Sequence, residues 1–275
     1  MPRLPLAQVT LCAVDTRAPA LAAQALLRSM AHVDFGRVIL FTHDWTPARV
    51  LPGIEIVDIE PLTSGADYSR FVLRFLPTYI RSSHALIAQW DGFVINPHAW
   101  TDEFLVHDYV GAVWPDQPHD CSVGNGGFSL RSRRFLHAGR DPRIVQEHPE
   151  DQVMCRTYRQ FLEREHGVSF APPALAQRFA FENGPASASF GFHGPYNLPH
   201  VLDEPTLLQW LAHLPDPFFA GRDARRLARS LILRRMPQAA RQVLARRKLA
   251  GRDDHNNLML GAAASMQDWI GAGRS

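Results

Sequence analysis

The sequence lacks long apolar runs and is poor in cysteine. No uninterrupted apolar stretch approaches the roughly 20 residues that a membrane-spanning helix needs, and the N-terminal MPRLPLAQVT lacks the apolar stretch of a secretory signal. The three cysteines are widely separated and odd in number, which argues against a disulfide framework or a zinc cluster: Cys12, Cys121 and Cys155. We therefore expect a cytoplasmic protein without redox chemistry.

Acidic residues are scarce near the C-terminus. The segment 222–252 holds a dense series of arginines and one acid, Asp223, whereas the preceding chain is correspondingly acidic. This asymmetry predicts a boundary near Pro215–Pro217. We expect one domain over residues 1–214 and a basic helical extension over residues 215–275.

The extension interleaves leucines with arginines in RDARRLARSLILRRM. Leu227, Leu231 and Leu233 among these cations suit a helix that lies on an anionic membrane or an acidic partner, which implies a peripheral position at the inner membrane face. A solvated basic face is the alternative. The extension has no DNA-binding motif and no interleaved aromatic platform, so we expect no nucleic-acid partner.

Before the boundary, strand-like and helix-like segments alternate. Runs of β-branched and apolar residues predict strands over 8–16, 37–44, 54–60 and 85–89. Residues 18–32 have the composition of a helix. Ser64 and Asp67 have the spacing of a capping box, which predicts a second helix start. This order predicts an α/β domain.

An acidic turn follows the strand predicted over 85–89. In QWDGFVINP, the carboxylate of Asp91 stands between a tryptophan and a glycine. Ligands of open α/β sheets bind outside the carboxyl ends of the strands. A carboxylate at such an edge can hold a divalent metal, which acts as a Lewis acid on an anionic leaving group. Asp91 is then the candidate first ligand of Mn²⁺ or Mg²⁺, and a simple turn cap is the alternative.

The order of motifs resembles that of glycosyltransferases with the GT-A fold. ADYSRFVLRFLPTYIRSSHALIAQWDGFVI is similar to the helix, strand and acidic turn of glycogenin-like sugar transferases, in which a Tyr-x-Arg helix precedes an Asp-x-Asp turn. Over roughly residues 8–200, a set of motifs resembles a bacterial family of glycosyltransferase-like proteins catalogued as a domain of unknown function: VTLCAVDTR, DYSRFVL, QWDGFV, VGNGGFSLRSR, HPEDQVMC and FGFHG.

This resemblance implies a fold and an activity. The fold is a GT-A-like, Rossmann-type mixed α/β sheet flanked by helices, to which the basic helical extension is appended. The activity is transfer of a sugar from a nucleotide-sugar donor, for which we expect a UDP-sugar, to a hydroxyl acceptor. The expected acceptor is a surface glycan or its lipid-linked precursor.

The resemblance places the donor at the end of the first strand. Asp15 accepts hydrogen bonds from the ribose or base, or else it caps the helix that begins near Ala18. Arg70 corresponds to a residue that reaches the donor, and a guanidinium binds phosphate in a bidentate manner; an exposed helix charge is the alternative. The candidate donor-binding residues are Val14, Asp15, Thr16, Tyr68, Arg70, Gln89, Trp90 and Asp91.

Positions 89–91 depart from the Asp-x-Asp pattern, because Gln89 replaces the first acid. His193 in FGFHGPYN matches the late histidine that supplies another metal ligand in many GT-A enzymes. The resemblance thus implies a metal held by Asp91 and His193, with water and phosphate oxygens completing the coordination. A histidine that satisfies a local hydrogen bond is the alternative.

The glycine-rich stretch GNGGFSLRS implies the pocket shared by donor and acceptor. Its glycines let the backbone approach a ligand or adopt positive φ, and it lacks the Gly-Lys-Ser ending of a P-loop. A plain β-bulge is the alternative. Trp114 is either a sugar platform or a core residue. The candidate pocket residues are Trp114, Asn125, Gly126, Gly127 and Phe128.

The start of the helix EDQVMC supplies the candidate general base. Asp151, with Glu150 as the fallback, is expected to face the acceptor beside Gly126 and Gly127 and to remove a hydroxyl proton. Helix capping is the alternative role of these acids.

Two other classes of function remain open. The missing first acid favours a catalytically inactive sugar- or nucleotide-binding module. A metal hydrolase that uses His107–Asp108 or His119–Asp120 is the less favoured one, because neither pair has the helical ligand spacing of a metalloprotease.

Overall fold

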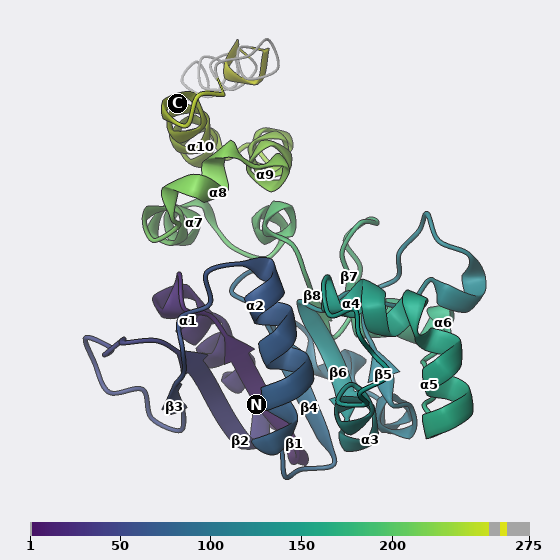
Figure 1. Cartoon of the computed structure of the whole chain (residues 1–275). Coiled ribbons are helices and arrows are strands. Elements are labelled where there is room, and N and C mark those ends of the chain that lie inside the picture. Colours follow the sequence, from purple (N-terminus) through teal and green to yellow (C-terminus); the bar gives the residue numbers. More distant parts are fainter. Residues whose placement is uncertain (1, 253–258, 263–275) are drawn as a thin grey trace. The chain divides into compact units, whose positions relative to one another are not determined.

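The structure is a computed structural model that describes residues 2–252 and 259–262 (Figure 1). It divides into two compact units, Met1–His193 and Gly194–Ser275. The division falls before the predicted boundary at residue 214. The reason is that the 3₁₀ helix Pro195–His200 already packs against α9 (Arg222–Leu233), and α7 (Glu204–Ala212) against α10 (Pro237–Leu249).

A six-stranded mixed sheet forms the centre of the first unit, in the order β3-β2-β1-β4-β6-β5. The first four strands pair in parallel, and β6 runs antiparallel to both β4 and β5. The strands are β1 (Leu4–Val14), β2 (Val33–Thr42), β3 (Glu55–Asp58), β4 (His84–Ala88), β5 (Tyr109–Val110) and β6 (Phe128–Ser132). The predicted fold class, a mixed α/β sheet flanked by helices, is confirmed.

The sheet register brings three loops to one edge. Cys12 of β1 lies opposite Ile87 of β4, so the carboxyl ends of both parallel strands reach the same edge. Because β6 is antiparallel, its first residue, Phe128, lies opposite Ala88 at the end of β4. The loops after β1 and β4 and the glycine-rich loop before β6 therefore meet there.

Helices cover both faces of this sheet. Alternate residues of β1 face opposite ways: Leu11 and Ala13 pack with α1 (Pro19–Met30), whereas Cys12 and Val14 pack with the helical segment around Phe71. That segment begins as α2 (Gly65–Arg70) and continues through the π-helix Phe71–Phe75 and the 3₁₀ helix Leu76–Thr78. The Ser64 side chain accepts from the Asp67 backbone N–H and Asp67 accepts from Ser64 N–H, so the predicted capping box is confirmed.

The remainder of the first unit packs beside β5 and β6. Its helices are α3 (Arg133–Ala138), α4 (Glu150–Gln152) continuing as the π-helix Val153–Thr157, α5 (Arg159–His166) and α6 (Pro173–Phe179). Two short parallel strands follow, β7 (Ala180–Phe181) and β8 (Gly191–Phe192). Short 3₁₀ helices occupy Pro97–Ala99, Asp102–Val106 and His119–Cys121.

The second unit is helical, as the sequence predicts for the extension. It contains α7, α8 (Asp216–Ala220), α9 and α10, and its buried core includes Trp210, Phe219, Leu227, Leu231 and Val243. Within residues 2–252 and 259–262, no helix is both long enough and apolar enough to cross a membrane.

Candidate functional site

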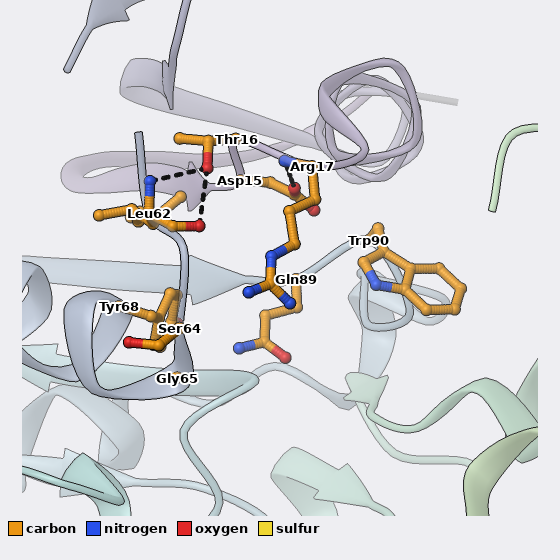
Figure 2. Close-up of a pocket in the computed structure, with 10 residues that line it drawn as sticks. Asp15, Thr16, Arg17, Leu62, Ser64, Gly65, Tyr68, Gln89 and Trp90 are labelled. Atoms are coloured by element: carbon orange, nitrogen blue, oxygen red, sulfur yellow. Dashed lines mark hydrogen bonds between the residues drawn. The ribbon is translucent and has the colours of Figure 1, made fainter. Parts of the chain in front are cut away.

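One pocket lies at the carboxyl ends of β1 and β4, and we call it the β1–β4 pocket (Figure 2). Six of the eight predicted donor-binding residues line it: Val14, Asp15, Thr16, Tyr68, Gln89 and Trp90. Arg17, Leu62, Ser64 and Gly65 complete the wall. Its volume of about 190 Å³ is below the roughly 300 Å³ at which small-molecule sites usually begin. A ligand as large as a nucleotide sugar would extend beyond these walls.

Asp15 lines this pocket and also holds the turn that precedes the first helix. Its Oδ1 accepts hydrogen bonds from the backbone N–H groups of Arg17 at 2.8 Å and Ala18 at 2.7 Å. Burial raises the pKa of the Asp15 carboxyl above its ordinary value, although these two hydrogen bonds oppose the shift. Asp15 therefore stabilises the turn before α1 and does not cap the helix itself, and its second oxygen, Oδ2, takes part in neither of these hydrogen bonds.

Arg17 is the cation of the β1–β4 pocket. Its side chain runs from the end of β1 toward Gln89, and its guanidinium donates to the Thr63 carbonyl (Figure 2). Thr16 ties the same loops together, because its hydroxyl bonds to both the carbonyl and the N–H of Leu62. A guanidinium held in this way presents its remaining N–H groups to an anion.

Gln89 also belongs to a group of four polar side chains that we call the edge cluster. Its members are Gln89, Asp91, Glu182 and His193. His193 Nδ1 lies 3.0 Å from Glu182 Oε1, and Nε2 lies 3.2 Å from Gln89 Oε1 and 3.5 Å from Asp91 Oδ1. Asp91 is 6% exposed. Among the described residues, its Oδ1 has no hydrogen-bond partner. The structure thus brings the two predicted metal ligands together.

The electrostatics of the edge cluster favour a cation. Burial alone would lower the pKa of His193, but the carboxylates of Asp91 and Glu182 outweigh it and raise the pKa well above its ordinary value. Asn125 Nδ2 also lies 3.0 Å from Nδ1. Since Nδ1 and Nε2 together face three acceptor oxygens and one donor, we assign the proton on Nδ1 to the bond with Glu182.

The glycine-rich loop fits closely around this cluster. A side chain on Gly127 would collide with the His193 ring, and one on Gly126 with the Glu150 carboxylate. The positive φ that the sequence assigned to the glycines belongs to Asn125, at 72°. Asn125 Oδ1 accepts from the N–H groups of Gly127 and Phe128 and so fixes its amide. These two glycines therefore make room for the side chains of His193 and Glu150, and the predicted close approach of the loop to a ligand stays a prediction.

The carboxylate of Glu150 is buried against Arg131, which argues against its predicted use as the fallback base. Its side chain is 5% exposed and that of Arg131 1%, and Arg131 NH2 lies 2.9 Å from Glu150 Oε1. Arg131 also donates to Ser129 Oγ and the Gly126 carbonyl. We call Arg131 and Glu150 the buried pair. Because the Arg131 guanidinium donates to both carboxylate oxygens of Glu150, the contacts of this carboxylate are those of a residue that stabilises the fold.

Asp151, the next residue, lies where the sequence places it. Its Oδ2 accepts from Gly126 N–H at 3.1 Å, and its Oδ1 from Gln152 N–H at 2.8 Å. The side chain is partly exposed. Asp151 is therefore beside Gly126, and its role as a base stays a prediction.

Three other predicted site residues neither line the β1–β4 pocket nor belong to the edge cluster. Arg70 bonds Glu147 at 3.0 Å with its side chain 65% exposed, and it is not among the residues that line the β1–β4 pocket. Trp114 packs over Gly124 and against the core around Tyr109. Phe128 is fully buried and stacks with Phe179. These corrections share one cause, since tertiary packing decides which way each side chain points.

The hydrolase alternative finds little support at His107–Asp108. Asp108 is buried and its carboxylate accepts from Ser132 Oγ, Ser169 N and Ser169 Oγ. No group of three or more His, Cys, Asp and Glu side chains in the part of the chain that the structure describes is arranged to hold a metal on its own.

Residues 53–193 match a family described as "Protein of unknown function (DUF5672)". The chain belongs to this family. The matched range contains the whole edge cluster and ends on His193, whereas Val14 at the end of β1 and the three residues after it precede the range. No curated protein matches the chain.

Remote similarity extends to solved glycosyltransferase structures. A mannosyltransferase, PcManGT from Pyrobaculum calidifontis in complex with GDP-Man and Mn²⁺, aligns with 94% of this chain and 80% of its own at 11% identity and a TM-score of 0.41. An active-site mutant of LgtC aligns over 68% and 89% at 12% identity, with a TM-score of 0.42. GlyE of Streptococcus pneumoniae TIGR4 aligns over 67% and 53% at 14% identity, with a TM-score of 0.41. All three scores are low, so no residue role, substrate or metal follows from them.

Sequence reasoning missed two residues of this DUF5672 site. Arg17 directly follows the Val14–Thr16 strand end, and that adjacency was an available signal. Glu182 had none, because its position depends on the pairing of Phe181 with Phe192 across two strands of two residues each. That register places the next residue of each strand, Glu182 and His193, beside each other.

Proposed function

We propose that this protein is a glycosyltransferase that moves a sugar from a nucleotide-sugar donor, most simply a UDP-sugar, to a hydroxyl acceptor in surface glycan assembly. One observation carries the proposal: the β1–β4 pocket adjoins the edge cluster through a shared residue, Gln89. A donor needs a nucleoside pocket and a charged site for its diphosphate, and these two features lie side by side at the sheet edge where α/β folds bind ligands.

In this proposal the β1–β4 pocket holds the nucleoside. Asp15 Oδ2 accepts from a ribose hydroxyl or a base N–H, and Tyr68 and Trp90 provide aromatic walls. Arg17 binds the diphosphate in place of Arg70, since it is the cation that lines the pocket. The remainder of the donor extends past Gln89 toward Asp91.

The edge cluster fits part of the coordination sphere of a divalent ion. Asp91 Oδ1, Gln89 Oε1 and His193 Nε2 would hold it, because these atoms converge and the buried Asp91 oxygen has no hydrogen-bond partner among the described residues. Phosphate and water oxygens would complete six ligands of the kind that Mn²⁺ and Mg²⁺ prefer. When bound, such an ion supplies Lewis-acid stabilisation of the departing diphosphate.

Asp151 is the proposed general base. It removes the proton of the acceptor hydroxyl as the oxygen attacks the anomeric carbon and the nucleoside diphosphate leaves. Two backbone N–H groups already bind its carboxylate and favour the ionised form, so its contribution comes from its position.

A matched pair of arginine variants tests the donor assignment. Thermal shift with UDP and UDP-sugars, with Mn²⁺ or with EDTA, is measured for wild type, Arg17→Ala and Arg70→Ala. We expect nucleotide stabilisation that falls in Arg17→Ala and is unchanged in Arg70→Ala. Binding without donor hydrolysis or transfer would favour the inactive module, and no stabilisation by any nucleotide would refute the proposal.

We also propose that the second unit contacts anionic membrane through arginines. Leu227 and Leu231 are fully buried within that unit, so they do not form the apolar membrane face expected from the sequence. Arg222, Arg225 and Arg229 share one exposed face of α9 with Leu233, which is 71% exposed. Flotation with anionic liposomes should fall on joint substitution of these arginines by glutamate and not on Arg70→Glu. Equal flotation of both variants would refute this contact.

A further inference from the structure

A second cavity lies next to Glu182 in the first unit. Its volume is about 350 Å³, within the range of small-molecule sites. The walls come from the loop around Trp114, from α6 and β7 and from the segment after β7: Val113, Pro115, Gln177, Ala180, Phe181, Glu182, Gly184, Pro185 and Ser187. We call it the Glu182 cavity.

The walls of this cavity are apolar with few polar groups. Phe181, Val113 and two prolines form apolar surface, and the polar side chains are those of Gln177, Glu182 and Ser187. The carboxylate of Glu182 is the charged group, and no lysine or arginine is among the lining residues. Such walls repel anions and suit a neutral ligand that has both an apolar face and hydroxyl groups to donate.

The carboxylate of Glu182 is held in place from two sides. Its Oε1 accepts from His193 Nδ1 at 3.0 Å, and its Oε2 accepts from Asn183 Nδ2 at 2.8 Å. Its side chain is 13% exposed. An ionised carboxylate has about four acceptor positions in all, so these two bonds are compatible with a third from a ligand hydroxyl.

One imidazole ring connects the Glu182 cavity with the donor side. Glu182 bonds one nitrogen of His193, and the other nitrogen faces Gln89, which lines the β1–β4 pocket. Transfer requires the acceptor hydroxyl and the donor sugar to meet within a few ångströms. A cavity that adjoins the edge cluster satisfies this requirement.

We propose that the Glu182 cavity is the acceptor subsite and that it binds a neutral pyranose, with Glu182 as the positioning residue that accepts one of its hydroxyl groups. This inference rests on the proposed glycosyltransferase function. It also divides the charges of the two substrates: the anionic donor faces Arg17, and the neutral acceptor sugar faces a carboxylate.

Saturation-transfer-difference NMR tests the subsite without the need for turnover. The probes are methyl glucopyranoside, methyl galactopyranoside and methyl mannopyranoside. Wild type should give a saturable signal with at least one of them. Ser187→Trp should abolish it by filling the cavity, whereas Ala186→Trp, the neighbouring exposed position outside the wall, should leave it unchanged.

Substitutions of Glu182 test its role separately. Glu182→Ala should weaken the bound pyranoside by ~10–100-fold, as expected for loss of a hydrogen bond to a charged group. Glu182→Gln, which keeps an acceptor oxygen, should recover part of that loss. Equal affinities for wild type and Glu182→Ala would overturn the positioning role.

The outcomes separate this inference from the proposed function. Nucleotide stabilisation without any pyranoside signal, or a signal that survives Ser187→Trp, overturns the acceptor subsite and leaves the donor assignment standing. A pyranoside signal in a protein that no nucleotide stabilises refutes the glycosyltransferase proposal and with it the acceptor role of the cavity.

Discussion

The buried pair and the edge cluster are both charged groups inside the first unit, yet they are built differently. In the buried pair, Arg131 donates to Glu150, Ser129 and the Gly126 carbonyl, and Glu150 N–H is in turn bonded by Ser69 Oγ. In the edge cluster, Asp91 keeps one buried oxygen that has no hydrogen-bond partner within the described ranges.

This difference separates a role in the fold from a role in binding. A buried charge without a partner costs free energy, so a group whose bonds are satisfied internally stabilises the structure relative to its broken form. A buried carboxylate oxygen that lacks a hydrogen bond among the described residues is able to accept one from a ligand. Neighbours in sequence can also differ in environment, since Glu150 is buried against Arg131 whereas Asp151 is partly exposed and bonds backbone N–H groups.

The largest expected effect is on Asp151. Asp151→Asn should lower kcat for transfer by ~10²–10⁴-fold, because the acceptor hydroxyl loses its positioned base, while donor affinity stays unchanged. Steady-state kinetics and nucleotide titration on the same preparation measure this. An unchanged kcat in a folded variant would leave Asp151 with a capping role only.

The second prediction concerns stability and not turnover. Glu150→Ala should lower the free energy of unfolding by about 3–5 kcal/mol, because it leaves the Arg131 guanidinium buried and without its partner. Urea denaturation measures it. Combining Glu150→Leu with Arg131→Met should restore most of the loss. Full stability of Glu150→Ala, together with lost transfer, would instead make Glu150 the base.

Asp91 should show the reverse behaviour. Asp91→Asn should change the free energy of unfolding by no more than about 1 kcal/mol. It should weaken Mn²⁺-dependent UDP binding by at least the ~10-fold that loss of even an outer-shell metal partner costs. Calorimetric titration with and without Mn²⁺ measures the binding. UDP affinity that is equal in both proteins at saturating Mn²⁺ would remove Asp91 from the donor site.

The smallest expected effect is the pH dependence caused by Asp15. Burial raises its folded pKa above the ordinary value of 3.8. The native state therefore binds the proton more tightly than the unfolded state, and the free energy of unfolding should fall as pH rises from about 3.8 through the folded pKa. Asp15→Asn keeps the acceptor for Ala18 N–H and should lack this fall. Parallel pH profiles of the two proteins would contradict the assignment.

Much of the fold and of the β1–β4 pocket could be predicted from the sequence. The β1 and β4 ends, the Ser64–Asp67 capping box and the position of Asp91 all follow from local patterns in the chain. Strand ends that are parallel neighbours meet at one edge, so residues after them are brought together by topology alone.

The remainder depended on contacts that no local pattern encodes. Arg70 and Arg17 are both arginines near the sheet edge, and only packing shows that Glu147 holds the first while the second lines the pocket. Glu150 and Asp151 differ because Arg131, a buried cation on β6, pairs with one of them. Glu182 and His193 meet through the register of β7 and β8. Strands of only two residues are too short to show a recognisable pattern in the sequence.

The β7–β8 pair also links the assembly of the edge cluster to the exchange of one backbone amide. The backbone N–H of His193 donates to the Phe181 carbonyl at 3.0 Å, and the rings of Phe181 and Phe192 stack at 5.8 Å. Opening this pair exposes the His193 amide to solvent and separates the imidazole from Glu182 in the same event. The rate at which that one amide exchanges for deuterium therefore reports the fraction of time that the imidazole and the carboxylate are apart.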